Sequence, residues 1–186
     1  MPNSVSIESA IPPGYAILPA EEHHLAFLNG IEKAAARIFP PEVLPPPMRD
    51  DAVPLEILTE AMALGRLWTA LGEDGVPVGY ALLRLRDGCA LLAQMDVHPA
   101  HARRGLGKAL VATVVEAAGR MGLPALYLTT FEHIPWNAPF YVRLGFGKLR
   151  PGAEPPFVRA ILREERKAGL SNRLAMARKI AGPAGQ

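Results

Sequence analysis

The sequence predicts an α/β chain of the α+β type, in which helices flank a mixed, mostly antiparallel central sheet. Two turn signals, Glu73-Asp74-Gly75 and Asp87-Gly88, separate three consecutive strand-like runs, and this pattern is typical of an antiparallel meander. A long amphipathic run then follows the third strand and leads to a fourth strand-like run. Because a helical connection usually joins parallel strands, we expect one parallel pair among antiparallel neighbours.

The first half of the chain predicts a strand, two helices and the meander. An apolar run at residues 15–18 indicates a strand, and apolar residues recur at helical spacing over 21–39 and 55–64. The segment from Pro40 to Pro54 is rich in proline, which lacks the backbone N–H, so we expect a stiff loop without regular structure. The meander strands are expected at residues 66–71, 76–86 and 89–97.

The second half predicts helices and strands in alternation. A helix should run from Leu106 to Met121, where Gly122 and Pro124 end it. The elements expected after it are a strand at 125–130, a short helix at 139–144, a strand beginning at Phe146, a charged helix at 156–168 and a strand at 172–180. We expect a single domain over residues 1–186, with its core in about 15–149 and the helix and strand of 156–180 added to it.

Composition narrows the class of protein. The chain is 49% hydrophobic and 20% charged, with a net charge of +2, which is typical of a soluble globular domain and argues against nucleic acid or an anionic membrane as partner. A single cysteine, Cys89, excludes an internal disulfide framework and a multi-cysteine zinc site. The segment Met1 to Ser6 lacks the basic and apolar regions of a signal peptide, so the expected location is cytoplasmic.

A glycine turn stands between the third meander strand and the long helix. It reads Gly105-Leu106-Gly107, and Arg103, Arg104 and Lys108 flank it. Such a turn points unpaired N–H groups at one spot, where the helix dipole and the basic side chains also favour an anion. The turn lacks the third glycine of a dinucleotide-binding unit and the hydroxyl residue of a Walker loop, so it predicts a phosphate site of another kind.

Two segments of this region resemble the GNAT family of N-acetyltransferases. The turn Ala102-Arg103-Arg104-Gly105-Leu106-Gly107, preceded by Val97-His98-Pro99, is similar to that family's phosphate turn, although Ala102 stands where the family has Gln or Arg. The second segment contains Asn137, Tyr141 and Gly145-Phe146 in the family's order. The departure at Ala102 removes one side chain from the pyrophosphate.

The resemblance implies acetyl-CoA as the acyl donor. In such enzymes parallel strands 4 and 5 splay apart, and the pantetheine arm lies in the gap. The resemblance assigns cofactor binding to the backbone and side chains of Met95, Asp96, Val97, Arg103, Arg104, Gly105, Leu106, Gly107, Lys108, Asn137 and Tyr141. It implies no metal, and we expect none from Asp96, His98 and His101, whose spacing crosses a proline turn.

The implied reaction moves an acetyl group to a primary amine by direct attack in a ternary complex. Tyr141 is the expected general acid, because a phenol keeps its proton at neutral pH and can give it to a departing thiolate. Glu132 is the expected base, with Asp96 and His133 as alternatives, since Thr129 occupies the position where some relatives have a glutamate.

The sequence leaves the identity of the acceptor open. A small-molecule amine is the leading prediction, and the alternatives are a protein N-terminus or lysine, or a non-catalytic protein that senses acetyl-CoA. We expect the loop from Pro40 to Pro54 to border the acceptor pocket, and Phe131 and Trp136 to line it or to belong to the core. Association into a homodimer also stays open.

Cations over 159–167 alternate with Glu164 and Glu165, which indicates a solvated helix face and not a nucleic-acid site.

Overall fold

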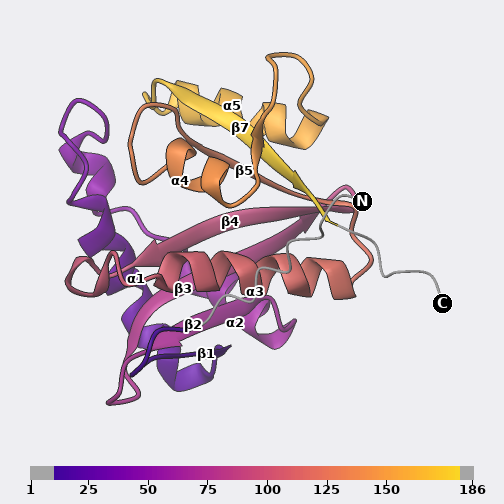
Figure 1. Ribbon diagram of the computed structural model, residues 1–186. Coiled ribbons are helices and arrows are strands. Elements are labelled where there is room, and N and C mark those ends of the chain that lie inside the picture. The colour runs from indigo at the N-terminus through magenta and orange to yellow at the C-terminus, as the bar shows by residue number, and fades with distance from the viewer. Residues whose placement is uncertain (1–10, 181–186) are drawn as a thin grey trace.

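The computed structural model describes residues 11–180, and the predicted sheet is present (Figure 1). Seven strands lie in the order β1-β2-β3-β4-β5-β7-β6, and the pair β4 and β5 alone is parallel among these described strands. The strands are β1 (Ala16–Pro19), β2 (Leu67–Leu71), β3 (Pro77–Arg86), β4 (Cys89–Val97), β5 (Ala125–Phe131), β6 (Gly147–Lys148) and β7 (Arg173–Lys179). The mixed, mostly antiparallel fold class is therefore confirmed. The ends of the predicted domain, including Met1 to Ser6, lie outside the described residues.

Helices cover both faces of the sheet. They are α1 (Leu25–Ala36), α2 (Leu55–Ala63), α3 (Leu106–Arg120), α4 (Ala138–Arg143) and α5 (Pro156–Lys167). One core cluster joins α3 and α4 to the sheet, and a second cluster joins α1 and α2 to the opposite face. On β5, Leu126 and Leu128 face α3, whereas the alternating residues Tyr127 and Thr129 contact α5. Helix α5 therefore lies on the same face as α1.

Three local predictions need correction. The helix expected at 21–39 begins with a 3-10 turn at Glu22–His24 and ends at Ala36, so Ile38 is exposed in the turn before Pro40. The proline-rich loop contains one 3-10 turn, Pro46–Arg49, because proline fits the first positions of a helical turn, where no N–H is needed. Phe146 is buried ahead of β6 and does not form part of that strand.

Strands β4 and β5 splay apart soon after they meet. They pair only at Ala90 with Leu126 and at Leu91 with Tyr127. On its other edge, β4 shifts register against β3 between Leu82 and Leu83, a β-bulge that places Ala93 as the extra residue. Because a bulge bends its strand, the C-terminal part of β4 turns away from β5 and leaves both facing edges without a strand partner.

Close packing holds the end of β4 against β3. A Cβ atom added at Gly79 of β3 would lie 2.9 Å from the carbonyl oxygen of Asp96, so the two backbones approach closely only because this residue is glycine. The turn after β4 passes through Gly105, whose φ of 90° is readily adopted by glycine and begins α3. Within residues 11–180, no helix is both long and apolar enough to cross a membrane.

Candidate active site

The splay opens into a cleft with a volume of about 1580 Å³. Its walls come from β4 and β5, from the start of α3, from α4, and on the opposite face from α1, the proline-rich loop and α5. The sheet therefore divides the cleft into two halves. We call the half on the α3 face the donor half and the half on the α1 and α5 face the acceptor half.

The donor half contains the predicted anion cradle. Gly105 caps α3 without a side-chain hydrogen bond among the described residues, so the N–H groups of its first turn point into solvent at the cleft. Arg103, Gly105, Leu106, Gly107 and Lys108 all line the cleft there. The helix dipole and two cationic side chains make this end of the cleft suitable for a pyrophosphate.

Arg104 lies beside the cradle and not in the cleft wall. Its Nη1 donates to the hydroxyl of Tyr15 at 3.0 Å, and the same hydroxyl lies 2.9 Å from Nδ1 of His101. Among residues 11–180, no three His, Cys, Asp or Glu side chains are grouped so that they could hold a metal ion. The cluster of Tyr15, His101 and Arg104 ties the turn after β4 to the residue before β1.

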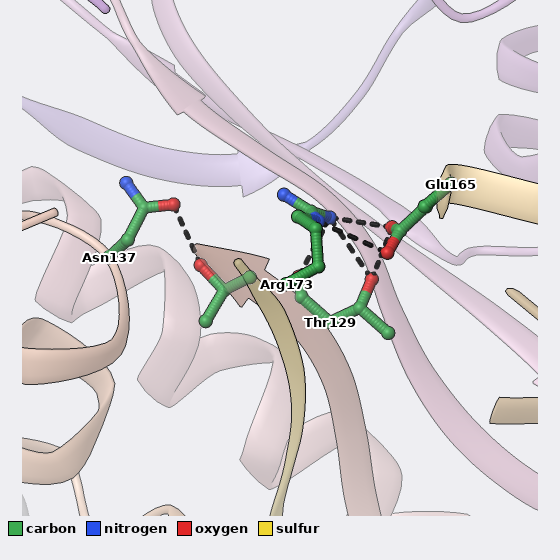
Figure 2. Close-up of polar contacts among 5 residues, drawn as sticks. Thr129, Asn137, Glu165 and Arg173 are labelled. Carbon is green, nitrogen blue, oxygen red and sulfur yellow. Dashed lines mark hydrogen bonds and ion pairs between the residues drawn. The ribbon is translucent and has the colours of Figure 1, made fainter. Parts of the chain in front are cut away.

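Residues that were predicted to bind the cofactor lie beside the open edges of β4 and β5. Met95, Asp96 and Val97 line the cleft from β4, and Asn137 lines it from the segment before α4. Thr130 donates to Oδ1 of Asn137 at 2.7 Å (Figure 2). This bond uses Oδ1 of Asn137 and leaves its Nδ2 available as a hydrogen-bond donor at the cleft.

Tyr141 reaches the cleft from α4 and is 9% exposed. Its ring packs edge-on against Phe140 and Phe146, at centroid distances of 5.1 and 5.6 Å. Burial raises the pKa of the Tyr141 phenol, and the negative charge of Asp96 raises it further. The hydroxyl therefore keeps its proton at neutral pH.

A carboxylate cluster lies across the sheet from Tyr141. Gln94 donates to Asp96 at 2.6 Å, and Tyr80, which is paired with Asp96 across β3 and β4, donates to Oε2 of Glu32 at 2.8 Å. Burial raises the pKa of Asp96 to about 7, with a further contribution from the charge of Glu32 and an opposing one from the Gln94 hydrogen bond. Burial also raises the pKa of Glu32. Asp96 can thus gain and lose a proton near neutral pH.

Glu132 and His133 lie outside the lining of this cleft. Lys148 donates to Oε1 of Glu132 at 2.9 Å, and His133 lies 3.9 Å from Oε2. The hydrogen bond and charge of Lys148 lower the pKa of the Glu132 carboxyl. The structure therefore brings Asp96 and Tyr141 to one cleft and holds Glu132 beside it in an ion pair.

A charged network at β5 was missed by the sequence analysis. Arg173 binds both carboxylate oxygens of Glu165, at 2.6 and 3.1 Å, and Thr129 donates to Glu165 at 2.6 Å (Figure 2). The pair is mostly buried, with 17% and 16% of the two side chains exposed. The sequence indicated a solvated helix face for α5, and only the pairing of β7 with β5 places Arg173 opposite Glu165.

The acceptor half has an aromatic wall. Phe39 packs against Phe131 at 5.4 Å and against Trp136 at 5.8 Å between ring centroids, and all three rings line the cleft. Leu44 and Met48 of the proline-rich loop line it beside them. Arg49 donates to the carbonyl oxygens of Phe39 and Leu44, at 2.7 and 3.0 Å, and so fixes this loop.

A phosphate cradle next to two splayed parallel strands is the arrangement of an acyl-CoA-binding transferase. A sequence profile described as the Acetyltransferase (GNAT) family matches residues 28–146, which is more than half of the chain. The chain belongs to the GNAT family of acetyltransferases, and acetyl-CoA is the donor that this family uses.

Solved structures of similar fold agree with this assignment. The N-acetylglutamate synthase of Neisseria gonorrhoeae, complexed with coenzyme A and N-acetyl-glutamate, has a TM-score of 0.68 at 17% identity, with 90% of this chain and 35% of that chain covered. The ribosomal-protein-S18-alanine N-acetyltransferase of Escherichia coli has a TM-score of 0.63 at 20% identity, covering 92% and 97%. The PaiA N-acetyltransferase of Thermoplasma acidophilum, in complex with coenzyme A, has a TM-score of 0.65 at 15% identity, covering 89% and 98%. This chain spans about a third of the Neisseria synthase, and at these identities the likeness extends to the fold alone.

Proposed function

We propose that this protein transfers the acetyl group of acetyl-CoA to the primary amine of a small molecule, by direct attack in a ternary complex. The proposal rests on one observation, namely that the sheet divides a single cleft into a donor half and an acceptor half. A cationic cradle and an open strand edge lie in the donor half, and a carboxylate cluster lies in the acceptor half. A thioester in the gap between β4 and β5 would be accessible to an amine from the other face.

In this proposal, the gap holds the donor by contacts along its length. The first turn of α3, with Arg103 and Lys108, binds the pyrophosphate. The open edge of β4 hydrogen-bonds the pantetheine amides as an added strand would, while Nδ2 of Asn137 donates from the other side. A backbone N–H of β4 beyond the bulge stabilises the oxyanion that forms on the thioester carbonyl.

Asp96 is the base that the geometry favours. The neutral amine nitrogen attacks the thioester carbon, and the proton that this nitrogen loses passes to Asp96, directly or through one water. Glu132 stays a prediction from the sequence, but its ion pair with Lys148 and its place beside the cleft support it less well. The carbon–sulfur bond then breaks, and the Tyr141 hydroxyl protonates the sulfur as it leaves. The products are an N-acetylated amine and free CoA, and solvent restores both side chains.

The proposal is tested by incubating the purified protein with acetyl-CoA and a panel of primary amines. Mass spectrometry should detect an acetylated amine, formed in proportion to the CoA released. Binding of CoA with no transfer to any small amine or peptide amine would contradict catalysis and favour a sensor of acetyl-CoA. Transfer to peptides alone would contradict the small-molecule acceptor.

A further inference from the structure

We infer that the acceptor carries an aromatic ring a short distance from its primary amine, an inference that rests on the proposed function. The aromatic wall of Phe39, Phe131 and Trp136 carries this inference. The three rings form a row from the interior of the cleft to its mouth, since Phe131 is 5% exposed and Trp136 is 44% exposed. An exposed tryptophan inside a concave site is typical of a surface that a flat apolar group covers.

The wall belongs to the acceptor half and not to the CoA site. Phe131 faces away from α3, because it alternates on β5 with Leu128 and Thr130, whose side chains lie on the α3 and α4 side. The Arg173 guanidinium lies 4.6 Å from the Phe131 ring centroid and fixes that ring in place. The adenine of CoA would have to cross the sheet to reach this wall.

The distance from wall to carboxylates sets the length of the acceptor. Glu32 and Phe39 both line the cleft, with the small residues Ala35 and Ala36 between them. Of the seven residues that follow Glu32 up to Phe39, four belong to α1 and three to the turn after it, so the two side chains begin on the order of 10 Å apart. Within residues 11–180, the protein contacts of Glu32 engage only Oε2, from Val53 N and Tyr80, so Oε1 can accept a hydrogen bond from the neutral amine of the acceptor. An amine at Glu32 and Asp96 would thus carry its ring on a linker of a few atoms.

Hydrogen bonds within the protein hold the proline-rich loop beside the wall. Arg49 ties the loop to the carbonyl oxygen of Phe39, in the turn after α1, and Val53 at the far end of the loop donates to Glu32 of α1 at 2.9 Å. A preformed apolar surface strengthens binding of a ring without an ordering cost. A polyamine or an amino sugar would leave the same surface uncovered.

The test compares kcat/KM for 2-phenylethylamine, butylamine and spermidine, and for a tetrapeptide with an N-terminal phenylalanine. The wild-type protein should favour 2-phenylethylamine over butylamine by roughly tenfold, as one apolar contact of about 1.4 kcal/mol gives. A higher kcat/KM for the tetrapeptide than for 2-phenylethylamine would support the same preference for an aromatic ring near the amine, with a peptide N-terminus as the acceptor. Equal values for all the small amines, or a preference for spermidine, would overturn the inference and leave the proposed function standing.

Substitutions in the aromatic wall test whether the preference for 2-phenylethylamine depends on this surface. Trp136→Ala and Phe39→Ala should each bring the ratio of the two kcat/KM values, for 2-phenylethylamine over butylamine, close to one. Phe27→Ala is the matched control, because Phe27 is an exposed phenylalanine on α1 outside the cleft lining, and it should keep the wild-type ratio. Calorimetric titration with CoA checks that each variant is folded. A ratio that stays at the wild-type value in both wall variants would also overturn the inference. If the wild-type protein acetylated no amine at all, that result would contradict the proposed function instead.

Discussion

Asp96 and Tyr141 approach the splay from opposite faces of the sheet, and each has the protonation state that its proposed role needs. Asp96 has a pKa of about 7 because burial and the nearby Glu32 disfavour its charge. Tyr141 keeps its proton because burial and the charge of Asp96 raise its pKa. The proposed chemistry thus uses two side chains that differ in burial and neighbours from the same residue types in water.

Substitution of Asp96 should change the pH dependence of the reaction. A base acts when deprotonated, so kcat/KM should rise as pH increases through about 7, where Asp96 loses its proton. Asp96→Asn should remove this rise and lower kcat/KM at pH 8 by roughly 10²-fold. Glu132→Gln is the comparison, and it should keep the wild-type profile. If Glu132→Gln abolished the rise while Asp96→Asn kept it, the base would be Glu132, as the sequence predicts.

Substitution of Tyr141 should separate chemistry from binding. Tyr141→Phe keeps the ring that packs on Phe140 and Phe146 and removes only the hydroxyl. We expect kcat to fall by about 10²-fold while the dissociation constant for CoA, measured by calorimetry, changes little. An unchanged kcat would exclude Tyr141 as the acid.

At the scale of elements, the start of α3 and the proline-rich loop line the two halves of the cleft, on opposite faces of the sheet. The glycine turn was predictable because its signals are local: Gly105 adopts a positive φ and the helix begins directly after it. The loop was predicted only as irregular, because the contacts that fix it come from Arg49 and Glu32, whose partners depend on the folded path of the chain.

Gly107 offers a test of the cradle. A Cβ atom there would lie 3.4 Å from Cζ of Phe140 and 3.6 Å from Sδ of Met95, and both residues line the cleft, so a larger side chain would occupy the space proposed for the donor. Gly107→Glu should lower affinity for CoA by at least about 10²-fold, since it adds both bulk and a negative charge. Gly107→Gln has the same size without the charge and should lose less affinity. Wild-type affinity in Gly107→Glu, measured by calorimetry, would contradict the cradle.

Arg49 tests the role of the loop. Arg49→Ala removes the two hydrogen bonds to the carbonyl groups of Phe39 and Leu44. We expect the KM for the amine to rise by about five- to tenfold, with the affinity for CoA unchanged. Arg37→Ala is the control, because its ion pair with Asp50 is exposed and should contribute little. Equal kinetics in Arg49→Ala and the wild type would show that the loop does not shape the acceptor pocket.

At the scale of the whole molecule, the sheet both separates and connects the two substrates. Strand β7 pairs along the whole of β5, which leaves the other edge of β5 free to face β4. The antiparallel meander of β2, β3 and β4 and the parallel pair of β4 and β5 were predicted from turn signals and the helical connection, whereas the place of β7 between β5 and β6 was not predicted. The contacts of Glu32 with Tyr80 and of Glu165 with Arg173 were not, because long-range strand pairing and helix packing bring those residues together.

A crystal structure of the protein with bound CoA tests the central claim most directly. We predict that the pyrophosphate lies at the first turn of α3 and that the pantetheine arm runs between β4 and β5 beyond Leu91, hydrogen-bonded to the β4 backbone. The thiol should end between Asp96 and Tyr141. A structure in which CoA binds elsewhere, or in which protein side chains fill the gap between β4 and β5, would contradict the account.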